Sequence, residues 1–199
     1  ENAGQELVAC LFQREDTLQE AAAVLSLSVS DVTEAERMLR SLINTVSAEE
    51  RGKTPLITFC YTANKAYPVY RLPQTTLFTQ LTSFVEPSLH VFATFYGGRL
   101  LLAPDEDSLS RYIRQLDNDE VLDGALAYRA GTDGLSDSYH FMMMADFGHV
   151  LEQSGHQVHY VPEFFLRNSE FFRNFILFAQ FTCADGMVYP NIVLKYKSE

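Results

Sequence analysis

The sequence predicts an α+β protein: a mainly antiparallel sheet built from β-hairpins, with amphipathic helices packed on one face. Strand-forming runs stand in pairs around turn residues, at 56–62 with 66–72 and at 89–96 with 99–103. A stretch with apolar residues at a spacing of three to four follows each pair, as in a helix with one buried face. Apolar residues make up 47% of the chain and charged residues 21%, so a globular core is expected.

The N-terminal residues predict one strand and a helical layer over 17–47. Residues 6–13 are rich in strand formers. Asp16 and Thr17 are expected to open a short helical stretch that runs to Leu25. A stronger helix follows, with Ser30 as the expected N-cap and an exposed i,i+4 pair of Glu36 and Arg40 on its surface.

A strand–strand–helix unit is expected to occur twice between residues 56 and 117, with a period of about 32 residues. The helix of the first copy is expected at 75–85. The helix of the second copy follows Asp105, with Leu109 and Ile113 in its buried stripe. We treat 1–199 as a single α+β domain in which the polar loop 47–55 is the candidate sub-boundary.

The C-terminal third predicts further strands and short helices. Residues 118–138 are rich in Asp, Gly and Ser and predict a long surface loop. A strand at 139–145 and a helical stretch at 147–153 follow. Residues 175–183 and 187–196 predict a final hairpin.

Charge and cysteine usage limit the classes of partner. The 199 residues contain 26 acidic and 15 basic side chains, which gives a formal charge of −11. Nucleic acids and anionic membrane surfaces are therefore poor partners. No apolar run is long enough to span a membrane, so no direct membrane insertion is expected. The three isolated cysteines do not suggest a disulfide framework.

No catalytic residue and no cofactor site can be assigned from motifs. The sequence contains no nucleophile elbow, P-loop or dinucleotide-binding fingerprint. His149, His156 and His159 are the candidates that we weigh for a metal site. His156 and His159 lie in an irregular Ser-Gly stretch that does not match HExxH, so a polar loop that contains histidines is the favoured interpretation and no metal is expected.

The phenylalanine pairs of the segment that begins at Pro162 are the most unusual feature. Pro162 is expected to start a helix in which Phe164 and Phe165 recur seven residues later as Phe171 and Phe172. These rings can form a wall of an apolar ligand cavity or a docking face for a protein, or they can simply pack this helix on the sheet. The packing interpretation is favoured.

Two parts of the chain resemble a group of bacterial envelope proteins. They are the run 96–105 with Ser108, Leu109, Tyr112 and Ile113, and the phenylalanine pairs with the C-terminal runs 180–182 and 188–194. The resemblance covers about 56–197. It implies a soluble α+β domain of a membrane-anchored or lipidated protein, with no catalytic residues, and hence an exported, periplasmic or envelope-associated location.

These observations lead to one expected function and one alternative. We expect a non-enzymatic binding or scaffolding domain of a cell-envelope protein, cut from a longer chain. Its partner would be another protein, a neighbouring domain of the same parent chain, or a second copy in a homo-oligomer. The alternative is an enzyme or carrier with a small-molecule or apolar ligand pocket near residues 140–165.

Overall fold

The computed structural model describes residues 3–13, 21–44, 56–63, 65–73, 90–119, 126–153 and 161–197. The chain divides into two compact units, Glu1–Glu120 and Val121–Glu199. Strands from both sides of the loop 47–55 join the same sheet of the first unit. That loop, the candidate sub-boundary, lies outside the described residues.

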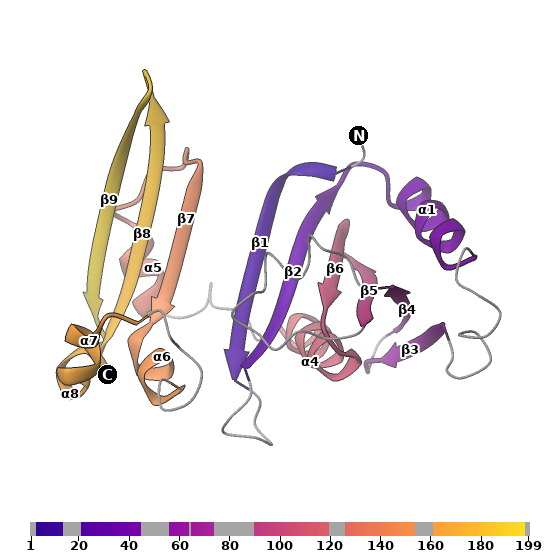
Figure 1. The fold of residues 1–199 in the computed structure, drawn as a ribbon, viewed down its shortest axis with the longest axis horizontal. Helices are drawn as coiled ribbons and strands as arrows, with labels where there is room; N and C mark the ends of the chain where they lie inside the picture. Colours follow the sequence, from indigo (N-terminus) through magenta and orange to yellow (C-terminus); the bar gives the residue numbers. More distant parts are fainter. Residues whose placement is uncertain are drawn as a thin grey trace. The chain divides into compact units, whose positions relative to one another are not determined.

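The first unit is built on a six-stranded antiparallel sheet with the order β1-β2-β6-β5-β4-β3. Figure 1 shows its long strands β1 and β2 beside the shorter ones. The bounds are β1 (Ala3–Gln13), β2 (Ala21–Val29), β3 (Ile57–Tyr61), β4 (Ala66–Pro73), β5 (His90–Tyr96) and β6 (Arg99–Ala103). The α+β class and the antiparallel hairpins are therefore confirmed.

Turn chemistry fixes the β5–β6 hairpin. Gly97 and Gly98 have φ values of 55° and 78°, which glycine adopts without strain. The two residues connect Tyr96 directly to its partner Arg99. Two left-handed residues in a two-residue loop match the twist of the flanking strands, so this sequence favours one register.

Two helices of this unit pack on opposite faces of the sheet. Leu109 and Ile113 of α4 (Glu106–Asp117) contact the face that contains Val69, whereas Ile43 of α1 (Val32–Asn44) contacts the face that contains Tyr70. The sequence predicted helices on one face only. Consecutive strand residues point to opposite faces, and Val69 and Tyr70 are both fully buried, so this sheet needs cover on both sides.

Two details of the expected N-terminal helical layer are wrong. The short helix expected from Asp16 to Leu25 is not formed at its C-terminal end, because Ala21–Val29 is the strand β2, paired with β1 and β6. The cap of α1 is Asp31 instead of Ser30: its Oδ1 accepts the backbone N–H of Glu34 at 3.0 Å. The helix expected at 75–85 lies outside the described residues, so the tandem repeat stays a prediction.

The second unit contains a three-stranded antiparallel sheet with the order β7-β8-β9. Its elements are α5 (Leu126–Thr132), β7 (Phe141–Asp146), α6 (Phe147–Gln153), α7 (Glu163–Arg167), α8 (Ser169–Phe172), β8 (Phe175–Ala184) and β9 (Met187–Tyr196). The final hairpin forms as predicted, with Asp185 and Gly186 at positive φ in its turn. The stretch 118–138 is not loop throughout, since it includes α5.

Helix α5 packs on one face of this sheet, behind the strands in Figure 1. The Phe178 ring of β8 is fully buried and lies directly against Gly131. Gln180 is buried beside it and exchanges two hydrogen bonds with the backbone of Ser136, of 2.9 and 2.6 Å. Asn191 of β9 donates to the carbonyl of Gly134 at 3.0 Å. Polar and apolar contacts together hold α5 and the following turn on this face.

Candidate interaction surface

The face of the β7–β9 sheet opposite α5 is apolar at every position. Its register aligns Phe141 with Phe181, Ala179 with Ile192, and Phe175 with Tyr196. Alternation along the three strands places thirteen side chains on this face, which we call the apolar face: Phe141, Met143, Ala145, Phe175, Leu177, Ala179, Phe181, Cys183, Val188, Pro190, Ile192, Leu194 and Tyr196. None of them carries a charge.

Much of the apolar face is open to solvent. The side chains of Val188 and Ile192 are 61% and 63% exposed, and those of Phe141 and Tyr196 are more than half exposed. Isolated exposed apolar residues are ordinary on a protein surface, but a contiguous patch of this kind marks an interaction site or an aggregation hazard. This face is therefore the strongest candidate functional surface of the described residues.

The phenylalanine pairs continue the apolar face at one end. The expected single helix is two short ones, α7 and α8, separated at Asn168. The break changes which rings point outward: Phe164 and Phe171 are 62% and 60% exposed, whereas Phe172 is buried. The Phe171 ring lies 5.0 Å from that of Phe175, a residue of the apolar face.

The four predicted rings lie together in space. The Phe172 ring lies 5.5 Å from that of Phe164, 4.8 Å from that of Phe165 and 5.1 Å from that of Phe171. These edge-to-face arrangements are among those that aromatic pairs prefer. The exposed rings Phe164 and Phe171 thus form a rim of the apolar face, anchored by buried Phe172.

The structure does not assemble a histidine cluster from its described residues. His149 is well exposed, and its Nδ1 lies 3.4 Å from Asp146 Oδ2. His156 and His159 lie outside the described residues. In the part of the chain that is described, no group of three histidine, cysteine or acidic side chains could hold a metal ion.

Asp146 instead connects the end of β7 to the residue after β9. Its Oδ1 contacts the ammonium of Lys197 and accepts the backbone N–H of Gly148 at 2.8 Å. Burial alone would raise the pKa of this carboxyl. The hydrogen bond and charge of Lys197, with smaller contributions from His149 and Gly148, outweigh burial and hold the pKa of Asp146 below its usual value. The role of Asp146 is therefore structural.

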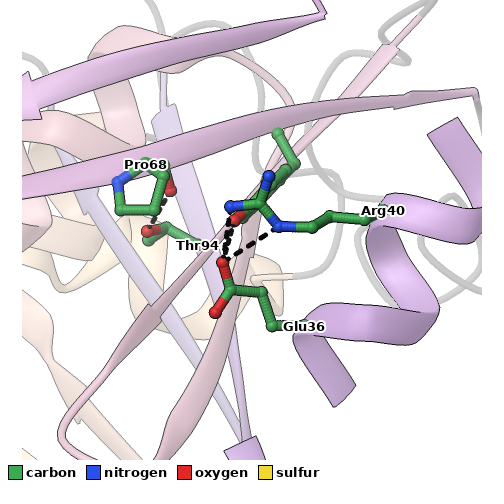
Figure 2. Close-up of polar contacts among 5 residues, drawn as sticks. Glu36, Arg40, Pro68 and Thr94 are labelled. Carbon is green, nitrogen blue, oxygen red and sulfur yellow. Dashed lines mark hydrogen bonds and ion pairs between the residues drawn. The ribbon is translucent and has the colours of Figure 1, made fainter. Parts of the chain in front are cut away.

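A polar cluster in the first unit joins α1 to the sheet. Figure 2 shows Arg40 reaching back along α1 to Glu36, the i,i+4 pair that the sequence predicted, with a closest N–O distance of 2.8 Å. The hydroxyl of buried Tyr70 donates to the same Glu36 oxygen. Beside it, Thr94 donates to the carbonyl of Pro68 at 2.7 Å, a further polar contact between β5 and β4.

These contacts shift the pKa values of both partners. Hydrogen bonds from Tyr70 and Arg40 hold the pKa of Glu36 below its usual value. Burial, followed by the hydrogen bond to Glu36, raises the pKa of Tyr70 to about 12. A neutral phenol and an ionised carboxylate are thus the stable pair at neutral pH.

Two shallow hollows of about 290 and 360 Å³ lie on the first unit. Glu36 lines the first hollow and is bonded to Arg40 and Tyr70. Glu6 lines the second hollow and forms an ion pair with Arg99 at 2.8 Å. Asp117, at the end of α4, accepts the hydroxyls of Tyr67 and Tyr96. These groups hold strands and helices together and do not form a nucleophile–base pair.

Comparison with known proteins yields no relative: no protein-family model matches this chain, and neither does any curated protein or solved structure. None of the described helices is long and apolar enough to cross a membrane. The fold and surface define an α+β protein in which one apolar sheet face is exposed among the described residues.

The sequence analysis singled out the phenylalanine pairs but missed the rest of the surface. Residues 187–196 are apolar at nearly every position, a pattern typical of a strand buried on both faces. The number of strands and helices nevertheless indicates that one face lacks a helix. A three-stranded sheet with apolar residues on both faces needs cover on both sides, and α5 packs on one of them.

Proposed function

We propose that this chain is a non-enzymatic binding module of an exported bacterial cell-envelope protein. The observation that carries the binding function is the apolar face with its rim, Phe164 and Phe171. A surface that combines a contiguous apolar centre with exposed aromatic rings is what protein interfaces use. The envelope location is supported by the resemblance of the residue pattern alone.

The charge distribution favours a protein over a nucleic acid as partner. The chain has a formal charge of −11, and the apolar face contains no lysine or arginine with which to contact phosphates. Two acidic and two basic residues, Glu163, Glu170, Arg167 and Arg173, stand in and beside α7 and α8. A nearly neutral edge around an apolar centre fits a protein surface.

Site-specific photocrosslinking in the cells that produce the protein tests this function. A photoreactive residue replaces Ile192 on the apolar face. In a matched control it replaces Arg129, an exposed residue of α5 in the same unit. We expect discrete protein adducts, recovered from the envelope fraction, from the first position and not from the second. Equal labelling from both positions would contradict a dedicated binding face, and adducts from a cytoplasmic fraction would contradict the location.

A further inference from the structure

We propose that the occupant of the apolar face is a second copy of this chain, docked face to face. This inference rests on the proposed function and identifies its partner. In such a dimer the two β7–β9 sheets form a sandwich about a two-fold axis, and each apolar face covers the other.

The exposed area is that of a stable interface. Six large exposed side chains of the apolar face present on the order of 600 Å², taking about 150–250 Å² for a large side chain. They are Phe141, Met143, Val188, Ile192, Leu194 and Tyr196. With Phe164 and Phe171 the area reaches about 850 Å², close to the roughly 800 Å² that each partner contributes to a standard interface.

The charge pattern is compatible with self-association. Two copies with a formal charge of −11 each repel one another, and a contact region without charges adds least to that repulsion. The apolar face is such a region. At its edge, Glu163 and Arg167 form an exposed pair on α7, so charges of both signs stand beside the face.

The centre of the face combines a small residue with large ones. Ile192 pairs with Ala179, a small residue in the middle of the central strand β8. Its cross-strand neighbours Ile192 and Met143 are large and exposed, whereas Ala179 is only 4% exposed, so the two large side chains stand above it on each copy. In a two-fold contact, Ile192 of one copy can pack between the large side chains of the other, as side chains do between the layers of a sandwich.

Sedimentation equilibrium between about 1 and 100 µM tests the dimer, since standard-size interfaces commonly give dissociation constants in or below this range. We expect a monomer–dimer equilibrium for the natural chain. Ile192→Glu buries an unpaired carboxylate from each copy and should weaken the dimer at least about 100-fold. Tyr189→Glu is the matched control: it adds the same charge to β9, but on the side that faces α5, and should leave the association unchanged.

Maleimide labelling of the thiol introduced by Ile192→Cys separates this inference from the proposed function. Peptide mass spectrometry distinguishes this thiol from Cys10, Cys60 and Cys183. Labelling that slows as the protein concentration rises supports the dimer. Rapid labelling of a chain that is monomeric throughout overturns it and leaves the binding function to a partner of another sequence.

Two further outcomes of the labelling experiment would overturn the dimer. A thiol that is protected in the monomer means that the face is covered within one molecule, which overturns both proposals. A thiol of a monomeric chain that is protected only by phosphatidylcholine vesicles identifies a lipid surface as the occupant and overturns the dimer.

Discussion

Single side chains in this protein mainly connect elements that are distant in sequence. Tyr70 is the clearest case, because its buried ring belongs to the sheet core while its hydroxyl is bonded to Glu36 of α1, 34 residues earlier. Arg40 lies over the same ring, 5.3 Å from its centroid. One phenol thus contributes packing, a charge-assisted hydrogen bond and a cation–π contact.

Removing this hydroxyl should destabilise the first unit. Tyr70→Phe deletes the hydrogen bond to Glu36, with an expected loss of about 1–2 kcal/mol in the free energy of unfolding. Tyr61→Phe is the control, since Tyr61 is 68% exposed on the edge strand β3 and should show no measurable change. Urea unfolding followed by circular dichroism gives both values, and equal values would show that the hydroxyl contributes nothing.

The same substitution should change the response to alkaline pH. The folded-state pKa of Tyr70 is about 12, above its ordinary value near 10, so the folded state holds this proton more tightly. Its stabilising effect is complete below about pH 10 and is lost as the pH rises towards 12. Between these values the natural chain should lose more stability than Tyr70→Phe does, and parallel curves would contradict the shift.

At the scale of elements, the second unit depends on how closely α5 approaches β8. Gly131 lies so close to the Phe178 ring that a Cβ would overlap it. The adjoining Tyr128 ring is 6.0 Å from the same phenyl group. The helix is seven residues long, too short to be stable alone, so this packing holds it in place.

Gly131→Ala should therefore destabilise the second unit even though alanine favours helices. Overpacking of a buried site costs about 1–3 kcal/mol or more. Gly134→Ala is the matched control, because its Cβ would meet only Val193 at an ordinary distance of 3.7 Å. Adding Phe178→Leu to Gly131→Ala should recover part of the loss, and a double-mutant cycle of unfolding free energies without coupling would contradict this contact.

Elements with a local cause could be predicted from the sequence. The β5–β6 and β8–β9 turns contain Gly97-Gly98 and Asp185-Gly186, and their chemistry determines both hairpins. The segment 21–25 was predicted as the end of a short helix, since Ala21, Ala22 and Leu25 would share one helical face. It forms a strand because β1 and β6 pair on its two sides. The residues of 21–25 alone give no information about these two partner strands.

In the candidate site, too, features with a local cause could be predicted and features that depend on distant residues could not. Phe164 and Phe171 could be identified because their spacing is unusual within one segment. The apolar face could not, since it requires the register that aligns Phe141, Ala179 and Ile192 across three strands. The side of the sheet that α5 covers depends on contacts such as that of Gly131 with Phe178. The pattern of apolar residues along a single strand does not predict such contacts.

For the whole molecule, the net charge opposes self-association and the apolar face favours it. A formal charge of −11 keeps copies apart, while the apolar face gains free energy when two copies meet. Charge repulsion between two molecules acts through the solvent and is screened by salt. Burial of apolar side chains is not weakened in this way.

The proposed dimer should therefore become tighter as salt is added. Raising the salt concentration from about 0.1 M to about 1 M shortens the screening length from about 10 Å to about 3 Å, which removes most of the repulsion between the copies. We expect the dissociation constant from sedimentation equilibrium to fall, while Ile192→Glu associates much more weakly than the natural chain at both salt concentrations. A dissociation constant that rises with salt would show that ion pairs between the copies hold them together, and that the apolar face is not the principal contact.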